Sequence, residues 1–459
     1  MATSEALHDR LGRNTVFSVL FTVDEAADPK GELIRRVRET GARISDLNMD
    51  EMLPDGSLAY EMSVFTTGDQ QMAAVREAMD AVVGIFVDEV IDVAMESHRG
   101  GACEMRSRAS IETNTDLRIV YTPGVARVCK AIEAEPQLAW EYTGIPNKVA
   151  IVTNGTAILG LGHIGCVPGM PVMEGKSAIF WEFAGISAEP ILVDTLDPEK
   201  FIETVCTIAP TFGAIQVEDV KAPECFRITR ELDKRLDIPV MHDDQYGTAT
   251  IVLAGLFSAM KKTGKKIEDM STAICGAGAA GTAIADLLLK AGAPDVVLCD
   301  SHGIVHRGRE ERMNDEKRAL AEWTNKENLT GSLAEAMKGR ALFIGVSQPD
   351  IVSRDMVRSM AKNPILFPLA NPVSEISPQD ARAAGAAVYA DGRMMNNALA
   401  YPGIFRGALD ARAKAITVEM MMAAARALAE IVPEGELLPE MMDPATHAAV
   451  AQAVMDAAK

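Results

Sequence analysis

The stretch from residue 271 to residue 300 restricts the fold of this chain more than any other part of its sequence. A short apolar run at 271–275 is followed by the pattern G-x-G-x-x-G and then by a helix of small residues at 282–290. A second apolar run, at 295–299, ends at Asp300, nineteen residues after Gly281. Strand, glycine turn, helix, strand and acid in this order are typical of a parallel α/β sheet that binds a dinucleotide.

The predicted dinucleotide contacts lie in the glycine turn and at the end of the second strand. They are Gly276, Gly278, Ala279, Ala280, Gly281 and Asp300. Glycines let the backbone approach a pyrophosphate, whose charge meets the helix N-terminus. Because a carboxylate repels a 2′-phosphate, Asp300 favours NAD over NADP, although Arg307 and Arg309 follow it closely.

Two further strand-like runs end in paired acids. The run 214–217 leads into Glu218 and Asp219, and the run 238–241 leads, through one histidine, into Asp243 and Asp244. Ligands of open α/β sheets bind at the carboxyl ends of strands, where adjacent carboxylates repel each other unless a cation or a proton intervenes. No Cys or His pair at ligand spacing accompanies them. The pattern predicts an all-oxygen site for Mg²⁺ or Mn²⁺, with solvated loop acids or helix N-caps as the alternative.

Composition excludes several classes of partner. The chain has 459 residues, a length at which two to four domains are expected. Its hydrophobic residues, 48% of the total, are enough to form their cores. A net charge of −20 argues against nucleic acid and against an anionic membrane surface. No signal peptide and no membrane span is predicted, and seven scattered cysteines without a C-x-x-C fit reduced thiols. We therefore expect a soluble, cytoplasmic protein.

The first hundred residues are predicted to form a separate module. Strand and helix signals alternate as βαββαβ between residues 15 and 97, which is typical of a ferredoxin-like layer of helices on one face of an antiparallel sheet. In this order, and in residues 28–33 at the first strand-to-helix turn, the module resembles an ACT domain. That resemblance implies an amino-acid or metabolite effector, with a purely structural role in assembly as the alternative.

Eight stretches between Met105 and Ala413 resemble malic enzymes of the smaller bacterial type and occur in the same order. They are residues 121–125, 154–162, 171–176, 218–225, 242–245, the glycine pattern, 369–372, and 396–397 with 401–408. The resemblance implies oxidative decarboxylation of (S)-malate to pyruvate and CO₂ with reduction of NAD, dependent on Mg²⁺ or Mn²⁺. Alternatives are NADP use, a related 2-hydroxy acid, a malolactic reaction, or a catalytically weakened sensor of amino acids and nicotinamide.

The resemblance also implies roles for individual side chains. These are Glu218, Asp219 and Asp244 as metal ligands, Tyr121 as general acid, Lys176 as general base, Asp243 as an acid near the lysine, and Asn371, Asn396 and Asn397 as malate-binding amides. A neutral lysine beside a cation can take the malate hydroxyl proton as the hydride leaves C2. After CO₂ is lost, a tyrosine can protonate C3.

Three local expectations accompany these roles. The apolar run 116–121 is predicted to be a strand that ends at the Pro123-Gly124 turn. Lys176 stands alone in an apolar run, so it either extends to solvent or works with a lowered pKa. The segment 390–396 is shorter than its counterpart in the family, and we expect Arg393 to help hold malate there, with a solvated surface arginine as the alternative.

These signals predict an α/β chain of four parts. They are an ACT-like regulatory domain (1–97), an α/β catalytic domain (98–243), a Rossmann-type NAD-binding domain (244–400) and C-terminal helices that pack back on the catalytic domain (401–459). We expect a homodimer or a dimer of dimers with malate as its small-molecule partner, and no nucleic-acid or membrane partner.

Overall fold

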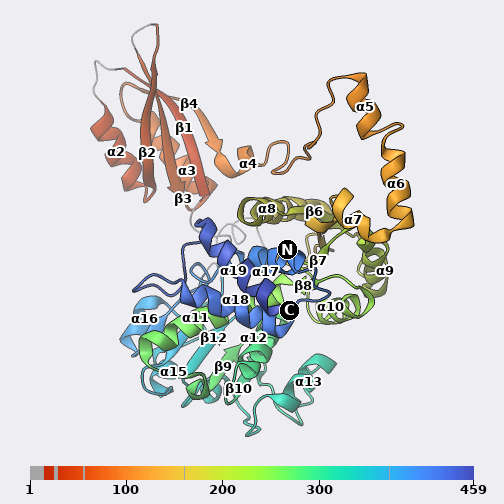
Figure 1. Cartoon of the computed structure of the whole chain (residues 1–459). Coiled ribbons are helices and arrows are strands. Elements are labelled where there is room, and N and C mark those ends of the chain that lie inside the picture. Colours follow the sequence, from red (N-terminus) through yellow and green to blue (C-terminus); the bar gives the residue numbers. More distant parts are fainter. Residues whose placement is uncertain (1–14, 25–28, 55–56, 160, 372) are drawn as a thin grey trace. The chain divides into compact units, whose positions relative to one another are not determined.

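The computed structural model describes residues 15–24, 29–54, 57–159, 161–371 and 373–459 (Figure 1). Asp28, Gly160 and Pro372, which belong to motifs named above, lie outside the described residues. The chain divides into two units. The first holds the described residues up to Ala102 together with Asn371 and Val373, and the second holds the rest. The predicted boundaries near 243 and 400 both fall inside the second unit.

The first unit is an antiparallel four-stranded sheet, with strand order β2-β3-β1-β4 and two helices on one face. Alternate residues of β1, including Val19 and Phe21, are buried against Leu33 and Val75 of those helices, because successive side chains of a strand point to opposite faces. The predicted βαββαβ order is confirmed. The elements are β1 (Thr15–Val23), α2 (Lys30–Glu39), β2 (Arg43–Met52), β3 (Leu58–Thr66), α3 (Asp69–Asp80), β4 (Ile85–Asp92) and the short α4 (Val93–Ser97).

The second unit contains two sheets that share one hydrophobic cluster, and each sheet has a further cluster of its own. The first sheet is parallel throughout, with strand order β6-β5-β7-β8. The predicted strands that precede the paired acids are confirmed as β7 and β8. The elements are β5 (Lys148–Thr153), α8 (Cys166–Ala184), β6 (Ser187–Leu192), α9 (Pro198–Ile208), β7 (Ala214–Val217), α10 (Glu224–Arg235) and β8 (Val240–His242).

The second sheet has strand order β11-β10-β9-β12-β13-β14 and is parallel except for β11. The chain crosses from the β10 side of β9 to the β12 side, so the carboxyl end of β9 lies at the point where strand order reverses. This is the predicted Rossmann-type arrangement. The elements are β9 (Thr272–Cys275), α12 (Ala279–Lys290), β10 (Val296–Asp300), β11 (Gly303–Ile304), α13 (Asp315–Trp323), α14 (Leu333–Met337), β12 (Leu342–Gly345), α15 (Arg354–Ser359), β13 (Ile365–Pro368), α16 (Pro378–Ala383) and β14 (Val388–Tyr389).

Helices join the two sheets and complete the core. A single π-helical turn, η5 (Asp243–Gly247), leads from β8 into α11 (Thr248–Thr263). The C-terminal helices are α17 (Tyr401–Asp410), α18 (Val418–Glu430) and α19 (Pro444–Ala457). Helix α17 packs against α8 and α19, and α18 packs against α11 and α19. Among the described residues, no helix is both long and apolar enough to cross a membrane.

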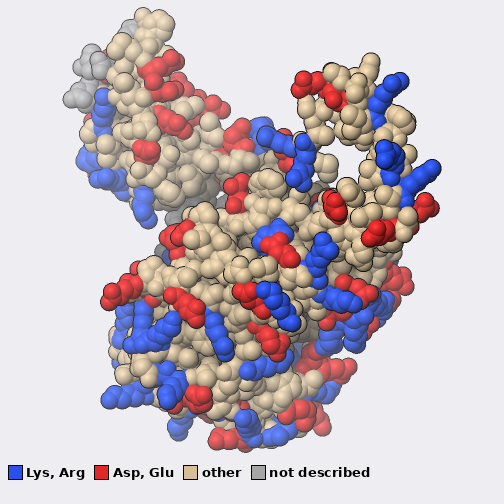
Figure 2. Space-filling model, in the orientation of Figure 1, with Lys and Arg blue, Asp and Glu red and all other residues tan. Residues whose placement is uncertain are grey.

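The segment before β5 differs from the prediction. Residues 114–120 form a helix, α5 (Asn114–Val120), and not a strand, and α6 (Val125–Ala134) follows. The reason is a reciprocal cap, in which the Thr113 hydroxyl accepts from the Asp116 backbone N–H at 3.2 Å and the Asp116 carboxylate accepts from the Thr113 N–H at 2.9 Å. We call residues 103–147 the arm, and none of them is buried. Figure 2 shows basic and acidic side chains exposed along it.

Candidate active site

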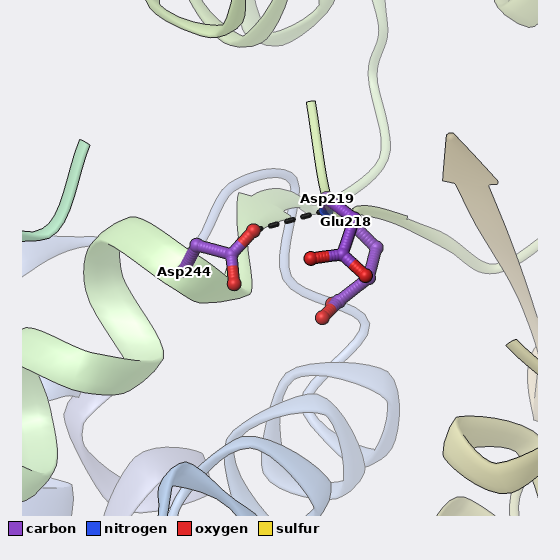
Figure 3. Close-up of side chains that lie close together, drawn as sticks. All are labelled: Glu218, Asp219 and Asp244. Atoms are coloured by element: carbon purple, nitrogen blue, oxygen red, sulfur yellow. Dashed lines mark hydrogen bonds between the residues drawn. The ribbon is translucent and has the colours of Figure 1, made fainter. Parts of the chain in front are cut away.

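Three carboxylates lie together at the carboxyl ends of β7 and β8. Glu218 and Asp219 directly follow β7, and Asp244 lies in η5. One oxygen of each lies within 4.8 Å of the others, and Figure 3 shows the three side chains turned toward a common space. The Asp219 backbone N–H donates to Asp244 Oδ2 at 2.9 Å, so the two strand ends are tied together. We call these three residues the carboxylate cluster.

The electrostatics of the carboxylate cluster favour a bound cation. Glu218 and Asp219 are buried. Burial is the largest cause of their pKa shifts and repulsion from Asp244 adds to it, so that the pKa of Asp219 rises to about 7 and the pKa of Glu218 rises well above its usual value. Asp219 Oδ2 is buried without a hydrogen-bond partner. A hard divalent cation such as Mg²⁺ or Mn²⁺ would relieve both the repulsion and the unpaired acceptor, and carboxylate oxygens are its preferred ligands.

Lys176 reaches the same acids from α8. Its Nζ lies 2.5 Å from Asp243 Oδ2 and 3.0 Å from Glu218 Oε1, and its side chain is only 14% exposed. The structure therefore supports a buried lysine rather than one that extends to solvent. Burial by itself lowers the pKa of Lys176, but the Asp243 and Glu218 carboxylates together raise that pKa well above its usual value. A cation in the carboxylate cluster would offset this negative charge and lower the lysine pKa again.

Asp243 links the lysine to one of the predicted asparagines. It is fully buried, and its Oδ2 accepts from both Lys176 Nζ and Asn397 Nδ2, the latter at 2.7 Å. Gly247 makes room for this acid, because a Cβ at that position would lie 1.8 Å from Asp243 Oδ1. Asp243 thus orients the lysine of α8 and the amide that follows β14.

Other predicted residues lie outside this group. Asn396 caps the short helix η7 (Asn397–Leu399) by accepting from the Ala398 backbone N–H at 2.9 Å, which commits its side-chain oxygen. Asn371, which follows β13, is exposed. Arg393 pairs with Asp391 at 2.6 Å and its side chain is 79% exposed, which supports the surface alternative for this arginine.

Tyr121 differs from the other predicted site residues in its location and its exposure. It directly follows α5, and the residue is 68% exposed. Figure 1 shows α5 at the outer end of the arm, away from α8 and β7. Within a single chain, the structure therefore brings together the predicted metal ligands, the lysine, Asp243 and Asn397, but not Tyr121.

Three buried residues beside the site were not selected from the sequence. Gln216 Nε2 donates to Glu218 Oε2 at 2.5 Å, and His242 Nε2 lies 3.2 Å from Asp244 Oδ2. Lys176 Nζ lies 4.4 Å from the centre of the Tyr401 ring. Strand alternation could have indicated Gln216, which is two residues before Glu218 and so shares its face of β7. Tyr401 comes from a distant helix, and although it begins one of the stretches that resemble malic enzymes, no pattern indicated its contact with Lys176.

The expected ribose acid is already paired. Asp300 ends β10 as predicted, with its side chain 10% exposed. Arg309 forms two hydrogen bonds with its carboxylate, one of them from Nη1 at 3.0 Å, and Lys317 Nζ donates at 2.6 Å. Although burial opposes it, these bonds lower the pKa of Asp300 far below its usual value. The negative charge of Asp300 is therefore largely offset by the positively charged side chains of Arg309 and Lys317.

Comparisons with known proteins cover nearly all of the second unit. Residues 101–233 match the family model of the malic enzyme N-terminal domain, and residues 245–395 and 386–459 match that of the malic enzyme NAD-binding domain. An NAD-dependent malic enzyme of Geobacillus stearothermophilus is 45% identical over 87% of this chain and 85% of its own length. A bifunctional malic/malolactic enzyme of Bacillus subtilis is 46% identical over 78% of this chain and 90% of its own length. The crystal structure of a malic enzyme from Pyrococcus horikoshii superposes with a TM-score of 0.77 at 43% identity, over 80% of this chain and 89% of that one.

Proposed function

The chain belongs to the malic enzyme family, and on that premise we propose that it converts (S)-malate to pyruvate and CO₂ with reduction of NAD. The observation that carries the proposal is the buried contact of Lys176 with Asp243 and Glu218 at the carboxyl ends of β7 and β8. The same unit carries the glycine pattern between β9 and α12. A proton acceptor, an acidic cation site and a dinucleotide fold are the parts that this reaction needs.

Each part has a separate task in the proposed reaction. Lys176 takes the proton of the malate hydroxyl, and Asp243 with Asn397 holds the lysine and the substrate in register. The glycine pattern between β9 and α12 would hold NAD, which would supply the acceptor for the hydride of C2. The carboxylate cluster would hold Mg²⁺ or Mn²⁺, whose positive charge would stabilise negative charge that develops on the substrate. Asn371 and Asn396 remain proposed malate contacts.

We propose that Tyr121 donates the proton to C3, and that it does so in a homodimer. The arm exposes Leu117, Ile119 and Tyr121, while the start of α8 exposes Val167 and Met170. Exposed apolar groups on two separate surfaces of one unit are typical of proteins that bind a copy of themselves. In this arrangement the arm of one subunit covers the α8 surface of its partner and brings Tyr121 to the partner's lysine.

A mixture of two inactive variants tests the shared site. Tyr121→Phe and Lys176→Met subunits are unfolded together, refolded and assayed. If the arm is exchanged, each mixed dimer contains one intact site of its two. Because about half of the dimers are mixed, about a quarter of the wild-type rate returns. If each chain completes its own site, no activity returns.

Two observations favour alternative activities, namely the use of NADP and a malolactic reaction. Arg309 and Lys317 offset the charge of Asp300, which lowers the barrier to the 2′-phosphate of NADP. A relative that is 46% identical over 78% of this chain is named a bifunctional malic/malolactic enzyme, so conversion of malate to lactate without net reduction of NAD is a second candidate.

We propose that the protein acts in the cytoplasm.

We also propose that the first unit binds a small effector. The unit has its own core, so a chain that begins at Met105 is expected to remain folded and active but to lose the effector response and part of its self-association. If that shortened chain aggregates, the first unit is a structural part of the enzyme.

One assay tests the main proposal. The purified protein is incubated with malate, Mn²⁺ and either NAD or NADP, and the reduced cofactor, pyruvate and lactate are all measured. Equal amounts of reduced NAD and pyruvate are expected. Lactate without reduced cofactor would establish the malolactic reaction, and cofactor binding without any product would support a sensor.

A further inference from the structure

Glu375 is a buried carboxylate that the proposed reaction does not use. Its side chain is fully buried, and none of the ion pairs among the described residues includes it. Its oxygens accept from two backbone groups instead. Oε1 accepts from the Ser347 N–H at 3.0 Å, and Oε2 accepts from the Ala370 N–H at 3.1 Å.

These two backbone groups follow neighbouring strands. Ser347 comes two residues after β12 and Ala370 two residues after β13, so Glu375 ties the carboxyl ends of both strands together. The carboxyl end of β12 adjoins the glycine pattern. A Cβ at Gly276 would lie only 2.6 Å from the carbonyl oxygen of Val346, which directly follows β12. The β13 side leads directly into Asn371.

Gly345 makes the space for this carboxylate. A Cβ on Gly345 would lie 2.3 Å from Glu375 Cδ and 2.4 and 2.6 Å from its two oxygens. A side chain at position 345 must therefore displace the carboxylate or be displaced by it. The segment is also fixed through its backbone, since the Val352 N–H donates to the Glu375 carbonyl at 3.0 Å.

Burying a carboxylate without a cation is costly, even when two N–H groups solvate it. Burial raises the pKa of Glu375, and the backbone hydrogen bonds only partly oppose the rise. An apolar side chain could fill the same space without this cost. An apolar side chain could not, however, hold two strand ends at a fixed separation through directed hydrogen bonds.

We propose that Glu375 is a positioning residue, which fixes the turn beside the dinucleotide relative to the chain that leaves the carboxyl end of β13. The inference rests on the proposed function, because it assumes that NAD and malate bind at these strand ends. Hydride transfer needs the C2 atom of malate and the nicotinamide within a few tenths of an ångström of their reacting positions. A displacement of about 1 Å costs roughly a hundredfold in rate.

Two variants break the same contact from opposite sides. Glu375→Gln keeps the shape but turns one acceptor into an N–H₂ group that faces a backbone N–H. Gly345→Ala keeps the carboxylate but pushes it aside. We expect each to lower kcat about ten- to a hundredfold, to change KM for NAD less than twofold, and to increase the isotope effect measured with malate deuterated at C2. Since both act on one contact, the double variant should be no slower than the slower single variant.

Asp295→Asn is the matched control. Asp295 is also a buried acid of this sheet, and it accepts from the Lys326 N–H at 3.1 Å and from Arg340 Nη1 at 3.3 Å, but it lies at the amino end of β10. This variant should lower Tm by an amount similar to Glu375→Gln while its kinetics stay within twofold of wild type.

The outcomes separate the two proposals. An inactive wild-type protein would contradict the proposed function and leave the Tm comparison to describe Glu375. An active wild-type enzyme whose Glu375→Gln and Gly345→Ala variants lose Tm as the control does, but keep kcat and the isotope effect, would overturn the positioning role. If Glu375→Gln does not fold, Gly345→Ala decides by the same criterion, and failure of both to fold would make Glu375 purely structural.

Discussion

The carboxylate cluster with Lys176 and the arm with Tyr121 carry the two halves of one proposed reaction, yet they are built in opposite ways. Lys176, Asp243 and Glu218 are buried and joined by contacts of 2.5 and 3.0 Å. The arm has no buried residue, and Tyr121 is exposed. The proposed proton acceptor is thus preformed within one chain, whereas the proposed proton donor must be brought to it.

This difference separates the effect of a substitution on folding from its effect on catalysis. A change in the buried group alters charges that are packed against each other, so it affects stability and activity together. A change at the tip of the arm removes no buried contact in the single chain, so it should affect activity alone. Substitutions in the two regions test this contrast.

The largest effect is expected at the carboxylate cluster. Asp244→Asn or Glu218→Gln removes a negative ligand, so activity should fall more than about a thousandfold, equivalent to about 4 kcal/mol of transition-state stabilisation. Calorimetry should show weakened Mn²⁺ binding, while circular dichroism shows a folded protein. Asp237→Asn, at an exposed acid just before β8, is the control and should remain active. Full turnover of wild type in excess chelator would refute the metal site.

Tyr121→Phe should come next, with a loss of about a hundred- to ten-thousandfold in kcat, the usual worth of general acid catalysis. Its Tm should match that of wild type, because the residue is exposed within its own chain and the ring is kept. Tyr142→Phe, another exposed tyrosine of the arm, is the control. A drop in Tm without a drop in kcat for Tyr121→Phe would remove the tyrosine from the mechanism and end the contrast between the two regions.

A smaller effect is expected at the dinucleotide edge. Asp300→Asn leaves Arg309 and Lys317 without their anion, so the ratio of kcat/KM for NADP to that for NAD should rise about tenfold. Asp315→Asn, at the exposed start of α13, should leave the ratio unchanged. An unchanged ratio in Asp300→Asn would mean that this acid serves only to hold the two cations.

The smallest effect is expected at Arg393. Its guanidinium is exposed and paired with Asp391, so Arg393→Ala should change KM for malate less than twofold. This reverses the expectation from the shortened segment 390–396. A rise of more than about fivefold in KM for malate, with KM for NAD unchanged, would restore the arginine as a substrate contact.

The parts that could be predicted from the sequence are those coded by local patterns. Two acid pairs after strand-like runs indicated the carboxylate cluster, because parallel strands end at one edge of a sheet and bring the residues that follow them together. The glycine pattern indicated the β9–α12–β10 unit in the same way. The run 116–121 was misread, since its β-branched residues suit a strand while the cap at Thr113 starts a helix.

The sequence alone thus determined the α/β class, the order of elements, the acids at the strand ends and the family. Only the tertiary structure decided which of these residues meet. Lys176, Asp243 and Asn397 come from α8, η5 and η7, and no spacing along the chain foretells their contact. The pairing of Asp300 with two cations, the hydrogen bonds of Glu375 and the exposure of Tyr121 belong to the same class of fact. Each depends on how side chains pack in three dimensions, which local periodicity does not encode because it records only which face a residue occupies.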